Sequence, residues 1–89
     1  MNVVELFPKQ PWRYAVPLLN AATGEQRTVV VTLSDAECAD AVRHARRAGR
    51  RGPGGHDGPI VRGYAMRRAQ AEALPGFEAS PAADFINTH

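Results

Sequence analysis

The chain has 89 residues, the length of one small domain, and 44% of them are hydrophobic. Many of these are alanines, so the core has to be small. No apolar run approaches the roughly 20 residues that span a bilayer, which predicts no membrane-spanning segment. The single cysteine excludes an internal disulfide framework, and the three histidines have no zinc-ligand spacing. We therefore expect a cytoplasmic protein without a metal, a cofactor or membrane insertion.

The net charge is only +2, but it is distributed very unevenly along the chain. Residues 43–68 hold eight basic side chains and one acidic side chain, whereas the segments before and after are acidic overall. Ten of the eleven basic residues are arginines. The guanidinium group suits phosphate recognition, although a GC-rich coding sequence also produces chains rich in Arg, Ala and Gly. This charge block is the first indication of a binding surface.

Residues 1–11 end in Phe-Pro-Lys-Gln-Pro, and two prolines so close together interrupt any regular element. We interpret 1–11 as an N-terminal arm that is either disordered or covers an open edge of the fold. The second alternative would use the apolar side chains of the arm, which are Val3, Val4, Leu6 and Phe7.

A β-hairpin is predicted over about 12–19 and 25–33. The first segment alternates large apolar residues with others, and the second is rich in Val and Thr. Gly24 in the connection supplies the positive φ that a four-residue hairpin loop needs. A register with Asn20 opposite Glu25 keeps the apolar side chains on one face, whereas a slip by one residue divides them. The apolar pairs of this register are Trp12 with Leu33, Tyr14 with Val31 and Val16 with Val29.

Pro17 lies within the first of these strands. Because proline has no amide donor, it predicts that this strand lies at an edge of the sheet or at a bulge. A two-stranded hairpin is marginal on its own in water, so a helix, a further strand or a second copy of the chain has to complete it.

The clearest helix signal covers about 35–48. Ser34 at the N-cap and Glu37 three residues later form a capping box, with apolar residues at the flanking staple positions. Acidic residues in the first turn and arginines in the last match the helix dipole, and Gly49 is typical of the position after a C-cap. Cys38 and a stripe of alanines are expected to face the core.

Glycines and prolines predict a mobile Gly/Arg loop over 49–59. A second helix is predicted over about 60–74, although the alternation of apolar residues in 60–66 also fits a strand. Residues 77–89 are rich in Ala, Ser and Pro, and we interpret them as a flexible C-terminal tail whose apolar residues either dock or fray. Together these elements predict a small α+β single domain over 12–76 with flexible termini.

The arginine block is the strongest candidate for a binding site. Four arginines between positions 43 and 50 are spaced i, i+3, i+4 and i+7, so on one helix they share a face, where their like charges repel. An anion would relieve that repulsion, and arginines of the second helix can join them if the two helices pack together. This arrangement predicts nucleic-acid binding through the phosphate backbone. The predicted contact residues are Arg43, Arg46, Arg47, Arg50, Arg51, Arg62, Arg67 and Arg68.

A plainer interpretation is that these arginines form a solvated helix end and pair with nearby carboxylates, which keeps the protein in solution. Trp12, Tyr14 and Tyr64 can stack on bases only if they are exposed, and the predicted register places Trp12 and Tyr14 on the core face. The glycine-rich loop has the composition of a phosphate-binding loop but lacks its Gly-Lys-Ser/Thr ending. We interpret that loop as a connector.

No set of residues predicts catalysis. His44 follows Asp40 by one helical turn and His56 is next to Asp57, but neither pair has a nucleophile beside it. Cys38 lies on the predicted buried stripe, close to carboxylates that disfavour a thiolate. We therefore expect a binding protein and not an enzyme.

The hairpin predicts a second kind of site. An edge strand with an apolar outer face lets another protein add a strand, and a second copy of this chain is one such partner. The alternative hypothesis is thus a protein-interaction or adaptor module, including self-association. If the arm or the tail already covers that edge, the site is lost. The residues assigned to this surface are Ala15, Pro17, Leu19 and Val30.

Overall fold

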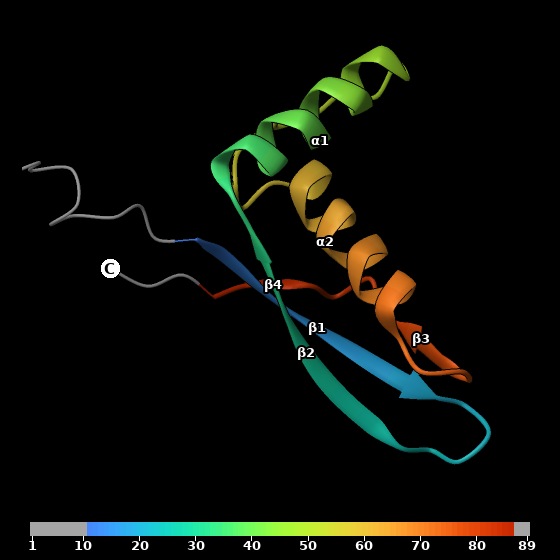
Figure 1. Ribbon diagram of the computed structural model, residues 1–89. Helices are drawn as coiled ribbons and strands as arrows, with labels where there is room; N and C mark the ends of the chain where they lie inside the picture. The colour runs from blue at the N-terminus through green and yellow to red at the C-terminus, as the bar shows by residue number, and fades with distance from the viewer. Residues whose placement is uncertain (1–10, 87–89) are drawn as a thin grey trace, which may run out of the picture.

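The computed structural model describes residues 11–86 and confirms the predicted fold class, a small α+β domain with a β-hairpin followed by two helices (Figure 1). In chain order the elements are β1 (Trp12–Asn20), β2 (Gln26–Leu33), α1 (Asp35–Arg47), α2 (Pro59–Glu72), β3 (Phe77–Ala79) and β4 (Asp84–Phe85). The predicted arm lies outside the described residues except for Pro11, and so do residues 87–89 of the predicted tail.

The hairpin has the predicted register. β1 and β2 pair antiparallel without interruption from Trp12 opposite Leu33 to Leu19 opposite Gln26. The connection closes with a hydrogen bond from the Asn20 amide to the Glu25 carbonyl, 2.9 Å long. The turn residue Gly24 has a φ of 76°, a conformation that side-chain-bearing residues rarely adopt. The alternation of large apolar residues was therefore sufficient to predict this pairing.

The first strand is not an edge strand, and this prediction was wrong. β3 and β4 both pair antiparallel with the side of β1 that faces away from β2, so β1 is central in the sheet. Residues 77–86 of the predicted flexible tail thus form part of the sheet. Phe77, which becomes buried, and Phe85, which contacts the Tyr14 ring, dock this segment. The edge assigned to Ala15, Pro17 and Leu19 as a strand-addition site is therefore already occupied.

Pro17 fits this central position because of the direction of its backbone. Its carbonyl accepts a hydrogen bond from the Ser80 amide, 2.8 Å away, so its backbone groups face β3 and not β2. Proline therefore removes no hydrogen bond from the long β1–β2 ladder. On the other side the pairing is already irregular, because β3 ends at Ala79 and Pro81 separates it from β4.

Both helices have the boundaries of the prediction to within two residues. The capping box of α1 is present: the Glu37 amide donates to the Ser34 hydroxyl, and the Ser34 amide donates to the Glu37 carboxylate. The helix ends at Arg47, and Gly49 follows with a φ of 80°. The stretch 60–66, which also fitted a strand, is helical as part of α2, which begins at Pro59 with Gly58 as its N-cap.

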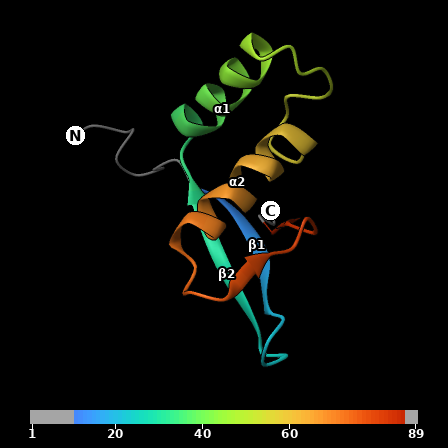
Figure 2. The ribbon, with the colours of Figure 1, turned by 90° about the vertical axis from the view of Figure 1, so that its right-hand side faces the viewer.

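The core lies between one face of the sheet and α2. α2 contacts β1, β2 and β3 and passes over β1 and β2 in Figure 2, and α1 packs against α2. Tyr14, Leu33 and Val61 are fully buried there, and Cys38 is buried as predicted. Neither α1 nor α2 covers the opposite face of the sheet, and Leu19 and Val30 are exposed on it. No helix in residues 11–86 is long and apolar enough to cross a membrane.

Candidate functional site

Of the four arginines predicted to share a helical face, one does not lie on the helix. Because α1 ends at Arg47, Arg50 lies beyond the helix and the predicted i, i+7 spacing does not apply to it. Arg46 turns back toward the chain that follows the helix. Its guanidinium donates to the carbonyl oxygens of Arg50 (3.3 Å) and Gly52 (2.8 Å). Arg46 thus fixes the path of the loop, which leaves fewer of its donors for a ligand.

Three more of the predicted contact residues are paired with carboxylates. These ion pairs are Arg43 with Asp40, Arg62 with Asp57 and Arg68 with Glu37. The last pair joins α2 to α1, and a hydrogen bond with Tyr64 is the main reason that the pKa of Arg68 is raised. The interpretation of the arginines as partners of nearby carboxylates therefore describes these three, but not the whole block.

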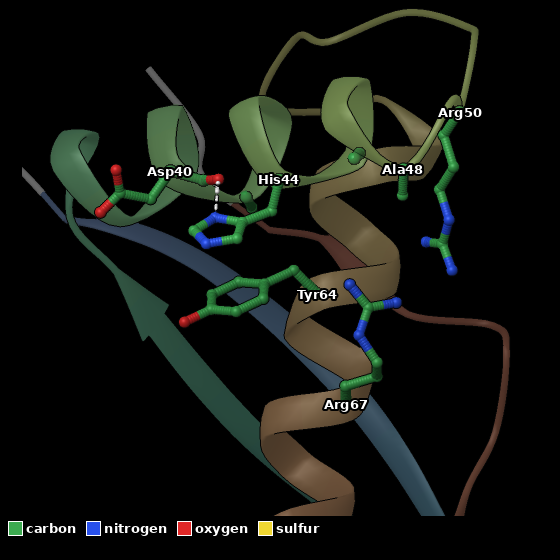
Figure 3. Close-up of a pocket in the computed structure, with 8 residues that line it drawn as sticks. Asp40, His44, Ala48, Arg50, Tyr64 and Arg67 are labelled. Carbon is green, nitrogen blue, oxygen red and sulfur yellow. Dashed lines mark hydrogen bonds between the residues drawn. The ribbon is translucent and has the colours of Figure 1, made fainter.

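Two other arginines converge on a groove between the helices (Figure 3). The groove has a volume of about 490 Å³. Arg50 enters it from the loop after α1, and Arg67 enters it from α2, with the Tyr64 ring one turn earlier on the same helix. The arginines near the end of α1 and those on α2 therefore do meet. Each group contributes one residue to the groove, Arg50 from the first and Arg67 from the second. The lining residues are Asp40, Ala41, His44, Ala45, Ala48, Arg50, Tyr64 and Arg67.

The arginine end of this groove is positively charged. Within residues 11–86, neither Arg50 nor Arg67 forms an ion pair. Asp40 is the one acidic lining residue; its carboxylate pairs with Arg43, and it lies at the opposite end from the two guanidinium groups (Figure 3). The groove thus presents two uncompensated positive charges beside an aromatic ring.

His44 contributes a polar atom to the middle of the groove. Its Nδ1 lies 2.7 Å from the backbone carbonyl oxygen of Asp40. Since a carbonyl oxygen can only accept, Nδ1 carries the proton and donates. Figure 3 shows the ring beside Tyr64. The sequence paired His44 with the Asp40 carboxylate, whereas the contact is to the main chain.

The glycine-rich loop is attached to the end of the sheet at His56. The imidazole stacks on the Trp12 indole, with ring centroids 3.7 Å apart. Trp12 also donates from Nε1 to Asp35, and the Tyr14 hydroxyl donates to the backbone carbonyl of His56 over 2.7 Å. The expected pair of His56 with Asp57 is not formed, because Nε2 of His56 lies 3.6 Å from Asp35. The sequence indicated this cluster only through the alternation of apolar residues in the first strand, which placed Trp12 and Tyr14 on the same face of the sheet.

We expect Tyr14→Phe to lower the free energy of unfolding by about 1 kcal/mol near neutral pH, because the His56 carbonyl loses its donor. Burial, and next the Cys38 thiol, raise the pKa of Tyr14 in the folded protein above 10.0. The unfolded chain therefore releases this proton first, so the contribution of Tyr14 is complete below pH 10.0 and declines above it. Denaturation at several alkaline pH values should show that the difference in free energy of unfolding between wild type and variant becomes smaller as the pH rises. A constant difference would contradict this prediction.

Nucleophilic chemistry has no support at Cys38. Burial raises the pKa of this thiol, a hydrogen bond with Tyr14 lowers it by less, and Asp35 and Glu37 add to the rise, so the thiolate is disfavoured. Within residues 11–86, no group of three or more His, Cys, Asp or Glu side chains is close enough together to hold a metal ion.

Comparison of the chain with protein-family models and with curated protein sequences finds no match, and no solved structure matches it either.

Proposed function

We propose that this protein binds nucleic acid through phosphate contacts in the groove between α1 and α2. The observation that carries this proposal is the convergence of Arg50 and Arg67. Two guanidinium groups from different elements reach into one groove without a carboxylate partner among the described residues. Their mutual repulsion is relieved when an anion lies between them.

A phosphate group suits this arrangement. Guanidinium donates parallel hydrogen bonds that match the oxygens of a phosphate, and such charge-assisted bonds are stronger than neutral ones. Tyr64 is only partly buried and its ring borders the same groove, so a base next to the bound phosphate can stack on it. The contacts are with the backbone of the nucleic acid, so they supply affinity with little sequence readout.

The exposed arginines at the end of α1 extend the site. Arg47 and Arg51 are exposed and flank Arg50 in the chain, and within residues 11–86 neither forms an ion pair. Four arginines are then available for phosphate in place of the eight that the sequence predicted. For duplex DNA each phosphate contact contributes about 0.9 to the slope of log K against log salt, which gives a slope of about −3 to −4.

We expect the double variant Arg50→Gln/Arg67→Gln to bind a short mixed-sequence duplex or single strand at least about tenfold more weakly than wild type. The salt slope should also become shallower by about 1.8, the equivalent of two phosphate contacts. Fluorescence anisotropy with a labelled oligonucleotide at about 50 and 200 mM salt measures both quantities.

The matched control removes two arginines elsewhere. Arg13 is exposed on β1 and Arg27 on β2, away from the groove, so Arg13→Gln/Arg27→Gln lowers the net charge by the same amount. This control should keep most of the affinity. Equal losses in both variants would indicate attraction by overall charge, and unchanged affinity after loss of Arg50 and Arg67 would end the proposal.

A further inference from the structure

The two edges of the sheet differ in how they are protected. On one side the edge consists of β3 and β4, which are short and separated by Pro81, as is common where proteins block further strand pairing. On the other side the edge is β2, a strand of eight residues that pairs with β1 without a bulge. β2 contains no proline, glycine or lysine, and its centre is a run of Thr and Val residues. No described residue pairs with its outer side.

The pairing within the sheet shows which backbone groups face this open edge. Asn20 donates across to Glu25, whereas the carbonyls of Arg13 and Pro17 accept from the opposite side, from Ile86 and Ser80. Alternate residues of β1 therefore direct their backbone groups toward β2, starting from Asn20. In the register of the hairpin, the residues of β2 that direct their N–H and C=O groups outward are Gln26, Thr28, Val30 and Thr32.

We propose that this edge binds the same edge of a second copy of the chain, antiparallel, with Val30 on the twofold axis. In this register Thr28 lies opposite Thr32 of the partner subunit, and the outward-facing residues Thr28, Val30 and Thr32 exchange hydrogen bonds with their counterparts. Opposite residues stay on the same face of the sheet because strand side chains alternate. The two sheets then form one continuous sheet with both α2 helices on the same side.

Self-pairing is favoured by the side chains as well as by the backbone. Val29 lies opposite Val31 of the partner subunit, which extends the apolar face under α2, and Val30, now 55% exposed, meets Val30 of the partner subunit. The twofold axis repeats each of these contacts, so one strand supplies both halves of the interface.

The dimer should form in the micromolar range, because pairing through one strand buries less surface than the roughly 1,200–2,000 Å² of standard stable interfaces. Sedimentation velocity over a wide range of concentrations should show a shift from one to two copies. Hydrogen exchange should show that protection of the Thr28 and Thr32 amides increases with protein concentration.

The decisive variant is Val30→Pro. It removes the outward N–H at the centre of the edge, but no hydrogen bond to β1, because Val30 faces Ala15 at a position where the pair is not hydrogen-bonded. The variant should stay folded and monomeric at all concentrations tested. Val30→Thr keeps the amide and the β-branched shape, so it serves as the matched control and should still dimerise.

Three outcomes would overturn the proposal. A wild-type protein that stays monomeric throughout would do so, and so would a Val30→Pro variant that dimerises as well as wild type. Protection of Thr28 and Thr32 that is independent of concentration would show that another segment of the same chain covers the edge. The proposal does not depend on nucleic-acid binding, because the groove of Arg50 and Arg67 lies between the helices and not at β2.

Discussion

Replacement of Phe77 by alanine is expected to lower the free energy of unfolding by about 3–5 kcal/mol. Phe77 is only 7% exposed, and it is the anchor of β3 in the core. Its ring also lies 5.2 Å from the guanidinium carbon of Arg27, so its loss affects β2 as well as β1. Because β3 has only three residues, its backbone pairing with β1 is too short to persist without this anchor.

Loss of the anchor should expose the second edge of β1. The Ser80 amide, which donates to Pro17, and the Ile86 amide, which donates to Arg13, should both exchange faster with solvent. Chemical denaturation measures the loss of stability, and hydrogen exchange followed by NMR measures the two amides. The newly open edge should also make the variant more prone to aggregate.

The neighbouring residue provides the control for Phe77. Glu78 is exposed and lies in the same short strand, opposite Leu19. Glu78→Ala keeps the strand and should change the free energy of unfolding by no more than about 0.5 kcal/mol. If Phe77→Ala cost as little as Glu78→Ala, the segment after α2 would not belong to the cooperative fold.

The parts of the fold that were predicted correctly have strong local signals. The register of the hairpin follows from the alternation of apolar residues around Gly24, and the start of α1 follows from the spacing of Ser34 and Glu37. β3 and β4 have three and two residues, too few for a periodic pattern. Their position depends on Phe77 and Phe85 finding space in a core built by other elements.

The groove depends on distant parts of the chain meeting. The block of arginines in the sequence was evident, but their side chains could be assigned only after the end of α1 and the crossing of α2 were known. Because α1 ends at Arg47, Arg46 binds the loop and Arg50 enters the groove. Arg67 lies near Arg50 because α2 packs against α1, and no local sequence pattern encodes that packing.

The loop over 49–59 makes contacts that its composition did not predict, and its mobility stays a prediction. Its glycines and prolines predicted mobility, yet its last turn is held against other parts of the fold. Gly58 is buried, donates its amide to the Gly55 carbonyl at 2.9 Å, and accepts at its own carbonyl from Arg62 in the first turn of α2. Gly58 is needed for space and not for an unusual backbone conformation, because its φ is −86°.

We expect Gly58→Ala to lower the free energy of unfolding by about 1–3 kcal/mol, because the core of this turn has no room for a methyl group. A Cβ at Gly58 would lie 2.8 Å from the Pro53 carbonyl oxygen and 3.1 Å from that of Gly55. Both are backbone atoms, so the loop has to move away from α2. Trp12 is the only tryptophan and stacks on His56 in this loop, so its fluorescence reports the displacement during the same denaturation experiment.

Gly55→Ala is the matched control for Gly58→Ala. A Cβ at Gly55 meets no atom within 4 Å, and its φ is not positive, so alanine fits there without strain. Alanine also restricts the unfolded chain, so this variant should be neutral or more stable by up to about 1 kcal/mol, with unchanged Trp12 fluorescence. Two variants with the same change in composition, three residues apart, should therefore differ in sign. If both were neutral, the turn before α2 would have enough freedom to admit a side chain, and the loop would be as mobile as its composition predicts.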